Sequence, residues 1–587
     1  MRTLNLGVLA HVDAGKTSLT ERLLHAAGAI DHLGSVDDGD TQTDSLALER
    51  QRGITIKSAV ASFVVGDVTV NLIDTPGHPD FIAEVERVLN VLDGAVLVVS
   101  AVEGVQAQTR VLMRTLRRLR IPTIVFVNKM DRPNADAERT VRAITEKLTP
   151  SLAAPDDTDR LAEVLAEHDD ALLKSYVDGV VPPADLRAAL AEQTERALVH
   201  PVFFGSAITG AGVDELISGI VEWLPAKEGD AGGPVSGTVF KVDRMPNGEK
   251  LAYVRMFSGT IRPRDRFDAG KVTALHTFGG GELSAGRIGG VLGLSKARIG
   301  DAVGLPGARA RHHFAPPTLE AVVEPRNPAH RGGLHAALTQ LAEQDPLINL
   351  RDDFRVSLYG EVQKEVIQAT LATDYGIDVA FRETTTIHIE RPVGVGAAVE
   401  FIGTGSNPFL ATVGLRVEPG TGVEFHLEVE LGSMPYSFFR AVEESARSAL
   451  CRAEVRDCAV TMTHSGYWAR QSHAHGTFDK SMSSTAGDFR GLTPIVLTEA
   501  LRRAGTEVLE PIHRLRLEIP SDALGAVATA LAKLRGVPLA PVLSGPVCVL
   551  DGEIPAGGVH EFQQLLPGLT RGEGVLEAEF DRYAPLR

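Results

Sequence analysis

Cysteine is scarce in this sequence, with three residues among 587. They are Cys451, Cys458 and Cys548. An odd number of thiols spread over a long chain does not indicate a framework of disulfide bonds, so the chain is expected to work in a reducing compartment, the cytoplasm. His464, His473 and His475 occur near Cys458, but no pair of closely spaced cysteines completes a four-ligand pattern, so a zinc site is disfavoured.

Long hydrophobic runs are also missing. No stretch approaches the roughly 18 consecutive apolar residues that a membrane-spanning helix needs. The apolar run at residues 4–10 has no basic region before it and leads into a polar, glycine-rich segment, unlike a signal peptide. We therefore expect a soluble protein without a membrane partner, divided into roughly four domains at about 150 residues each.

Positive charge is in deficit, since 59 Lys and Arg face 76 Asp and Glu and give a formal net charge of −17. Indiscriminate coating of nucleic acid depends on neutralising phosphates, so this balance argues against it. Local basic patches could still contact RNA.

A phosphate-binding loop follows the first predicted strand, residues 4–9. Residues 10–17 read AHVDAGKT, and an amphipathic helix is predicted over residues 18–27. In such a loop, backbone N–H groups and the helix N-terminus converge on phosphate oxygens. Lys16 would neutralise the β and γ phosphates, and Thr17 would offer its hydroxyl to Mg²⁺. Ala10 stands where the general pattern has glycine, so the motif needs support from elsewhere in the chain.

Support comes first from the segment around the expected γ-phosphate. The predicted strand at residues 68–73 leads into DTPGH, in which Asp74 would hold the Mg²⁺ shell and Gly77 would let the backbone approach the γ-phosphate. Thr55, in the preceding ERQRGITI segment, is placed to bind Mg²⁺ as a switch residue that hydrolysis would release.

Two further strand ends predict a guanine site. The strand at residues 123–127 ends in NKMD, where the Asp131 carboxylate would accept hydrogen bonds from guanine N1–H and the exocyclic amino group. These two donors distinguish guanine from adenine. The run at residues 202–204 ends in GSA, where a backbone amide would meet guanine O6. Each motif follows a predicted strand, as ligand sites in open α/β sheets do.

The sequence therefore predicts GTP and Mg²⁺ as ligands. The predicted GTP-binding residues are Asp13, Ala14, Gly15, Lys16, Thr17, Ser18, Asp74, Gly77, Asn128, Lys129, Asp131, Ser206 and Ala207. The predicted Mg²⁺ ligands are Thr17, Thr55 and Asp74.

The motifs AHVDAGKT, ERQRGITI, DTPGHPDF and NKMD resemble those of the translational GTPases of the elongation factor G branch, and the resemblance extends over the whole chain. Within that branch, VFKVDRMPNGEKLAYVRMFSGTI (239–261), RAGTEVLEP (503–511) and the short segment before GSA resemble the ribosomal protection proteins for tetracycline resistance. The resemblance implies that His78 orients the attacking water when the sarcin-ricin loop of the 70S ribosome contacts it. It also implies catalytic roles for Lys16 and Thr55 and an auxiliary role for Asp13 near the phosphates. The isolated protein should hydrolyse GTP slowly, because positioning and charge neutralisation supply most of the catalysis.

The predicted fold class is a multidomain assembly of α/β, β and α+β parts, expected to be a monomer. A P-loop GTPase domain occupies residues 1–227, and short strands with turns predict a β-barrel at 234–310. Alternating strands and helices predict two split βαβ, ferredoxin-like domains at 315–384 and 509–587. Between them, residues 385–508 form a strand-rich arm with one strongly helical stretch, 437–453.

The arm contains a long polar segment, residues 464–490, that suits contact with RNA phosphates and stacking on exposed bases. Its relevant side chains are Arg470, Lys480 and Arg490 with Tyr467, Trp468, Phe478 and Phe489. The resemblance places the arm in the ribosomal decoding region, with Lys480, Ser481, Met482 and Ser483 at its tip. This tip differs from the Tyr-Ser-Pro-Val of the commonest protection proteins and resembles that of the group that protects oxytetracycline-producing actinomycetes. A solvated loop whose aromatics pack on their own domain is the alternative.

The main prediction is a ribosome-dependent GTPase that releases tetracycline from the A site of the small ribosomal subunit. Two alternatives stay open: a translocase of elongation factor G type or a paralogue of it, and a GTP-dependent ribosome-binding regulatory factor.

Overall fold

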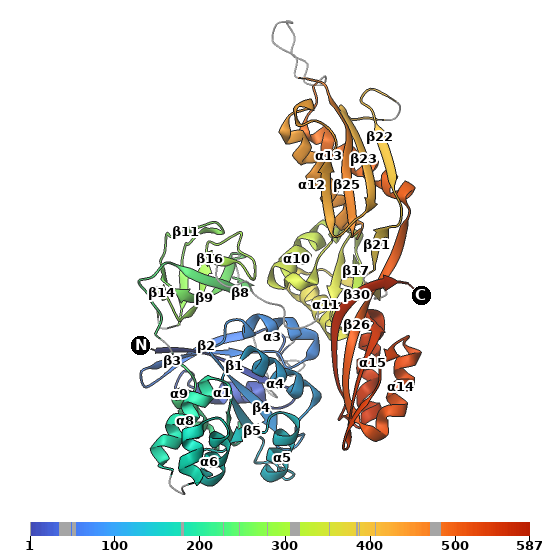
Figure 1. Ribbon diagram of the computed structural model, residues 1–587. Coiled ribbons are helices and arrows are strands. Elements are labelled where there is room, and N and C mark those ends of the chain that lie inside the picture. The colour runs from blue at the N-terminus through green and yellow to red at the C-terminus, as the bar shows by residue number, and fades with distance from the viewer. Residues whose placement is uncertain are drawn as a thin grey trace. The chain divides into compact units, whose positions relative to one another are not determined.

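The computed structural model describes most of the chain (Figure 1). The described residues are 2–34, 49, 55–177, 181–226, 228–245, 247–278, 280–305, 317, 319–351, 353–382, 385–386, 388–404, 407–469 and 483–586. They form two compact units. The first consists of Met1–Thr384, Leu515–Gly552 and His560–Glu579, and the second of Thr385–Arg514, Glu553–Val559 and Phe580–Arg587.

A seven-stranded sheet of order β2-β3-β1-β4-β5-β7-β6 forms the centre of the N-terminal domain. The strands are β1 (Arg2–Ala10), β2 (Ala59–Val65), β3 (Val68–Asp74), β4 (Gly94–Ser100), β5 (Thr123–Asn128), β6 (Leu152–Ala153) and β7 (His200–Phe204). All pairs are parallel except β2 with β3. The four strands predicted before the nucleotide motifs are therefore confirmed. Because they are parallel, the motifs that follow them lie at one edge of the sheet.

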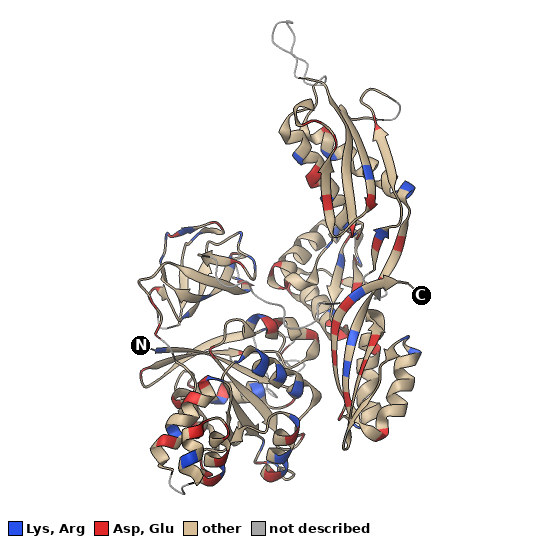
Figure 2. Ribbon diagram, viewed as in Figure 1, with Lys and Arg blue, Asp and Glu red and all other residues tan. Residues whose placement is uncertain are grey.

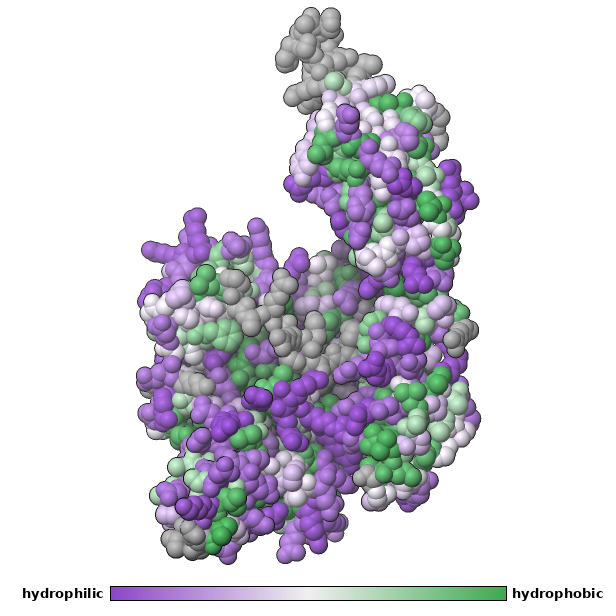
Figure 3. Space-filling view, in the orientation of Figure 1, coloured by the Kyte–Doolittle hydropathy of each residue, from purple (hydrophilic) through white to green (hydrophobic). Residues whose placement is uncertain are grey.

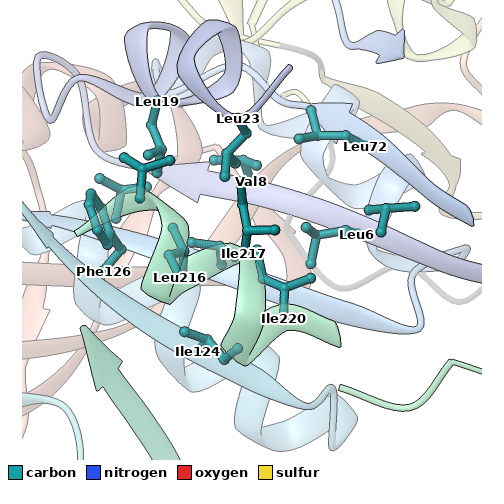
Figure 4. Packing of buried hydrophobic residues seen from close by; sticks show 14 of the residues in the cluster. Leu6, Val8, Leu19, Leu23, Leu72, Ile124, Phe126, Leu216, Ile217 and Ile220 are labelled. Carbon is teal, nitrogen blue, oxygen red and sulfur yellow. The ribbon is translucent and has the colours of Figure 1, made fainter. Parts of the chain in front are cut away.

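Helices cover both faces of this sheet. They are α1 (Lys16–Ala26), α3 (Ile82–Leu89), α4 (Ala107–Leu119), α5 (Ala137–Lys147), α6 (Thr158–Ala166), α7 (Asp170–Val177), α8 (Pro183–Glu195) and α9 (Val213–Trp223). On one face, Leu19 and Leu23 of α1 and Ile220 of α9 pack against Leu6 and Val8 of β1 (Figure 4). The spacing of four residues places Leu19 and Leu23 on one side of α1. Burying each contributes roughly 1.5–3 kcal/mol.

The opposite face is covered by α3, α4 and α5. Leu112, Met113 and Leu116 of α4 pack there against Leu97 and Val125 of the sheet. The helices α6, α7 and α8 form a separate cluster beside the β6 edge, with Trp223 of α9 buried in it. Helix α1 thus packs against β1, and the phosphate loop connects the two.

Residues 236–304 form antiparallel sheets, the largest of order β13-β15-β9-β8-β16. The strands are β8 (Ser236–Arg244), β9 (Lys250–Ser258), β10 (Thr260–Ile261), β11 (Arg266–Phe267), β12 (Gly270–Lys271), β13 (Leu275–Thr277), β14 (Leu283–Ser284), β15 (Ile288–Leu292) and β16 (Ala302–Gly304). Two further pairs, β10 with β14 and β11 with β12, complete the strands. Closure into a barrel stays a prediction.

The next module alternates strands and helices as predicted. Its elements are β17 (Leu319–Pro325), α10 (Arg331–Gln344), β18 (Arg355–Leu358), α11 (Glu361–Tyr375), β19 (Val379–Phe381) and β20 (Thr385–Thr386). The sheet has the order β18-β17-β19, with β20 also paired to β17. A 3-10 helix, Pro346–Ile348, connects α10 to β18. The complete split βαβ order stays a prediction.

The C-terminal elements also follow the predicted alternation. They are β26 (Thr506–Pro520), α14 (Leu524–Lys533), β27 (Val537–Pro538), β28 (Val542–Ser544), β29 (Val547–Pro555), α15 (Ala556–Thr570) and β30 (Val575–Pro585). Their sheet has the order β21-β26-β29-β27, where β21 is Ile389–Pro392; β28 pairs with β29 and β30 with β26.

The arm contains a sheet of order β22-β23-β25-β24 and two helices. Its strands are β22 (Gly396–Glu400), β23 (Ala411–Pro419), β24 (Val423–Leu427) and β25 (Cys458–Tyr467), and its helices are α12 (Tyr436–Arg452) and α13 (Ala486–Ala504). The helical stretch predicted at 437–453 is confirmed as α12, whereas the second helix, α13, was not predicted. Thr485 and Asp488 form a capping box that starts α13, and Leu492 and Val496 bury its inner face. Gly487 and Pro494 obscure that periodicity in the sequence.

No helix among the described residues is long and apolar enough to span a membrane. Hydrophilic side chains cover much of the face seen in Figure 3, with smaller hydrophobic patches between them.

Candidate nucleotide site

The motifs at the sheet edge surround a cavity of about 470 Å³. Among the described residues it is lined by His11, Val12, Asp13, Gly15, Lys16, Thr17, Ser18, Leu33, Gly34, Thr55, Gly77, His78, Asn128, Lys129, Asp131, Arg132, Ser206, Ala207 and Ile208. Its volume lies in the range of small-ligand pockets. Residues of all the predicted nucleotide motifs therefore meet at one cavity, although the motifs are far apart in sequence.

The phosphate loop has a backbone that requires glycine at one position. Asp13 and Gly15 adopt left-handed conformations, with φ of 66° and 83°. A Cβ atom at Gly15 would lie 2.5 Å from Nδ2 of Asn128, too close for any other residue. Helix α1 begins directly afterwards at Lys16, so its N-terminal N–H groups lie beside the cavity. Backbone N–H groups arranged in this way bind phosphate oxygens.

Four polar side chains cluster at the start of α1. Lys16 Nζ donates to Asp74 Oδ1 at 2.5 Å and to Thr55 Oγ1 at 3.0 Å, while the hydroxyls of Thr17 and Thr55 are 2.9 Å apart. Asp74 is fully buried and Lys16 is 6% exposed, so each charge compensates the other. Two hydroxyls and a carboxylate are hard oxygen donors of the kind that Mg²⁺ prefers. The three predicted magnesium ligands therefore meet and fit that ion.

Gly77 and His78 lie on the other side of the phosphate loop. A Cβ atom at Gly77 would lie 3.2 Å from the carbonyl oxygen of Ala10, so the close approach of the two loops favours glycine. The His78 side chain lines the cavity and is 25% exposed. Its Nδ1 accepts a hydrogen bond from the Asp80 N–H at 3.2 Å. A neutral imidazole that accepts at Nδ1 carries its proton at Nε2, which is a donor.

Asn128 joins the phosphate loop to the loop that follows β7. Its Nδ2 donates to the Ala14 carbonyl oxygen, and its Oδ1 accepts from the Ala207 N–H, both at 2.9 Å. Ala14 thus contributes its carbonyl to Asn128, and its side chain is buried. Lys129 has a left-handed backbone, φ 65°, and an ion pair of 3.0 Å with Glu103, while Asp131 lines the cavity nearby.

His11 is a cavity residue that the sequence analysis did not single out. Its ring is 5% exposed, and its Nδ1 lies 2.9 Å from the hydroxyl of Thr109 on α4. Burial lowers its pKa to about 4, which keeps the ring neutral near pH 7. The position of His11 in AHVDAGKT could have drawn attention to it, but the contact with a helix nearly a hundred residues away has no local signal.

The segments that follow Thr55 and Gly77 form hydrogen bonds with the module at residues 319–382. The Asp80 carboxylate accepts hydrogen bonds from the N–H groups of Val362 and Gln363, at 2.9 and 3.2 Å, where α11 begins. Lys57, two residues after Thr55, donates to the Gln344 side chain at 2.7 Å. Movement of either segment would therefore be transmitted to this module.

The arm tip is only partly described. Lys480, Ser481 and Met482 lie outside the described residues, as do Arg470 and Phe478, whereas Ser483 is described. The expectation that Phe489 stacks on bases was wrong, because it is fully buried and stacks on Phe438 at 4.7 Å. Tyr467 is half-buried against the same core, 5.8 Å from the Phe438 ring.

Among the described aromatic residues of this segment, Trp468 stays accessible, with 41% of its surface exposed. The Ser484 hydroxyl accepts from the Trp468 N–H at 2.8 Å, and the Ser484 N–H donates to the Trp468 carbonyl at 3.1 Å. Arg490 is exposed and lies 3.6 Å from Glu444.

Comparisons with known proteins agree with this geometry. Residues 1–226 match the family model of the elongation factor Tu GTP binding domain, residues 377–505 that of elongation factor G domain IV, and residues 507–587 that of the elongation factor G C-terminus. Fold and site thus define a GTPase-type protein with the architecture of elongation factor G.

Full-length relatives narrow this class. The chain is 48% identical to the oxytetracycline resistance protein of Streptomyces rimosus, over 100% of this chain and 96% of that protein. It is 46% identical to the tetracycline resistance protein TetM of Streptomyces lividans, over 100% and 98%, and 37% identical to TetP of Clostridium perfringens, over 99% and 94%. A crystal structure of a protein from Thermus thermophilus is 25% identical with a TM-score of 0.65, over 100% and 97%. The chain belongs to the family of tetracycline resistance proteins.

Proposed function

We propose that this protein is a ribosome-stimulated GTPase that releases tetracycline from the A site of the small ribosomal subunit. The observation that carries the proposal is the likeness to the oxytetracycline resistance protein along essentially the full length of both chains. The assembled nucleotide site supports it, because each motif required for binding GTP lies at one cavity. The partner is the 70S ribosome, and the protein acts as a monomer in the cytoplasm.

The residues at the start of α1 act on the phosphates. Lys16 neutralises charge on the β and γ phosphates, in exchange for its ion pair with Asp74. Thr17, Thr55 and Asp74 hold Mg²⁺, which when bound offsets the charge that develops between the two phosphates. His78 orients the attacking water through the Nε2 donor that its contact with the Asp80 N–H leaves available. The sarcin-ricin loop of the ribosome completes this arrangement.

The other end of the cavity selects guanine. Asp131 accepts from N1–H and the exocyclic amino group of the base, and the amide of Ser206 or Ala207 donates to O6. Asn128 and Lys129 hold the loops that carry these groups. Asp13, Ala14, Gly15 and Ser18 supply backbone contacts to the phosphates.

The release of the Thr55 and Gly77 segments after hydrolysis is the switch. Because Asp80 and Lys57 are bonded to the module at residues 319–382, the change reaches that module directly. We assign the boundaries 1–227, 234–310, 315–384, 385–508 and 509–587 to the five domains. The arm, 385–508, contacts ribosomal RNA with its tip at Lys480, Ser481, Met482 and Ser483, and Trp468 stacks on a base beside that tip.

Release of radiolabelled tetracycline from purified 70S ribosomes, measured with phosphate release in the same tubes, tests this function. Drug release together with ribosome-dependent hydrolysis is the expected result. Hydrolysis without drug release would contradict it and favour another ribosomal task. Replacement of elongation factor G in a tRNA translocation assay would point to a translocase.

A further inference from the structure

A basic groove lies on the N-terminal domain, away from the nucleotide cavity. It encloses about 710 Å³ between the C-terminal ends of α4 and α8. Its lining residues are Arg114, Arg117, Arg118, Arg120, Glu195, Arg196, Ala197 and Leu198. Five of these are arginine, and one of the described lining residues is acidic, in a chain whose net charge is −17. Arginine and lysine colour several turns of α4 in Figure 2.

Arg114 has a structural task within the protein, and Arg118 also interacts with another group of the protein. Arg114 forms ion pairs with Glu518 and Glu577, the latter at 2.6 Å. The other four arginines are exposed. Arg117 donates to the Leu148 carbonyl oxygen at 3.3 Å, and Arg196 lies 3.5 Å from Glu192 in an exposed pair, which contributes little. The groove therefore keeps an excess of positive charge at its surface.

Helix capping explains only part of this cluster. Cations favour helix C-termini, which accounts for Arg117 and Arg118 in the last turn of α4. Arg120, however, follows the helix in a left-handed conformation with φ 54°, where glycine or asparagine is usual, and Ala197 has the same conformation, φ 55°, across the groove. Both positions come just after the end of a helix, where a left-handed residue is a common way for the chain to leave the helix.

We propose that this groove binds the phosphate backbone of RNA when the protein is on the ribosome. All its cations are arginine, whose planar fork matches phosphate oxygens better than lysine does. Arg117, Arg118 and Arg120 are exposed at the C-terminal end of α4, so their charges reach neighbouring phosphates of one backbone. An acidic protein segment is the competing partner, because a carboxylate also pairs with the guanidinium fork.

The inference rests on the proposed ribosome binding and adds a second RNA contact to the arm. The test variant carries Arg117→Gln, Arg118→Gln and Arg120→Gln. Its matched control carries Arg142→Gln, Arg160→Gln and Arg187→Gln, which are exposed on the same domain outside the groove. Neither set touches the nucleotide cavity, so affinity for a fluorescent GDP analogue reports whether each variant is folded.

Binding to 70S ribosomes is measured with a non-hydrolysable GTP analogue over a series of salt concentrations. The groove variant should bind about tenfold more weakly, and the slope of log K against log salt should decrease by about 2 to 3, at roughly 0.7 to 0.9 for each lost phosphate contact. The control should behave like wild type. Lysine at the same three positions should restore most of the slope and only part of the affinity. A groove variant with wild-type affinity and slope overturns the proposal.

Failure of the proposed function gives a different result. If the wild-type protein does not bind ribosomes at all, that function fails, and the groove is then judged by the same variants on purified ribosomal RNA, with the same expected losses. Binding to polyglutamate tests whether the partner of the groove is an acidic protein segment instead of RNA. If wild type binds it more tightly than RNA, and the groove variant loses only that binding, the groove is a site for acidic protein and the RNA proposal is wrong.

Discussion

Replacing Asn128 with alanine tests the link between the phosphate loop and the base-binding loop. The side chain is 2% exposed, and its amide holds the Ala14 carbonyl and the Ala207 N–H, each at 2.9 Å. Alanine leaves both backbone groups without this partner in a buried place. Each unsatisfied group costs about 1–3 kcal/mol, so the two together cost about 2–6 kcal/mol.

The lost hydrogen bonds destabilise the conformation of the two loops that binds nucleotide. We expect Asn128→Ala to lower affinity for GTP and GDP by about 30-fold or more, since about 1.4 kcal/mol corresponds to tenfold. The ratio of the two affinities should not change, because Asn128 bonds to neither Thr55 nor Gly77, which flank the γ-phosphate position. Titration with fluorescent GTP and GDP analogues measures both constants.

Asn71→Ala is the matched control. Asn71 is also 2% exposed and donates to the Asn5 side chain at 2.9 Å in the same sheet, but it does not line the cavity. It should lower the thermal midpoint of the protein and leave nucleotide affinity unchanged. If Asn128→Ala and Asn71→Ala both lose stability but both bind nucleotides as tightly as wild type, the bridging role of Asn128 is refuted.

Four further outcomes are expected. His78→Ala should lower ribosome-stimulated phosphate release by about 100-fold or more without changing GTP affinity; wild-type turnover would contradict its role. Asp131→Asn replaces an acceptor by a donor and should lower GTP affinity by about 10- to 100-fold while improving that for xanthosine triphosphate, so unaltered guanine specificity would refute the assignment. Burial lowers the pKa of His200 to about 4. Between pH 6.5 and 4 the unfolded chain therefore takes up a proton that the folded chain does not, and the free energy of unfolding falls by up to about 1.4 kcal/mol per pH unit. In His200→Gln the thermal midpoint should fall less steeply over this range than in wild type, and parallel curves for the two proteins would contradict the reasoning. Glycine at every position from Lys480 to Ser483 should abolish tetracycline release and leave ribosome-stimulated turnover intact, whereas unchanged release would remove the tip from the mechanism.

The motif residues that meet at the nucleotide cavity could be predicted from the sequence alone. Lys16, Asp74 and Asn128 were predicted from motifs that follow strands, and the cavity contains or adjoins each of them. This works because the carboxyl ends of parallel strands must share one edge of a sheet, so that linear order gives spatial proximity without any knowledge of side-chain packing. The limits of the four strands that precede the motifs also follow from apolar periodicity, to within a few residues.

Which polar or aromatic side chains face outward could not be predicted from the sequence, because it depends on how the elements pack. Phe489 looked accessible within a polar run, yet the start of α13 turns it into the core of the arm. His11 contacts Thr109, and Arg120 and Arg196 line the same basic groove, although the residues of each pair are separated by more than seventy positions in the sequence. Local patterns fix the direction of a side chain only relative to its own helix or strand. Which neighbour it meets depends on how those elements pack, and that is a property of the whole chain.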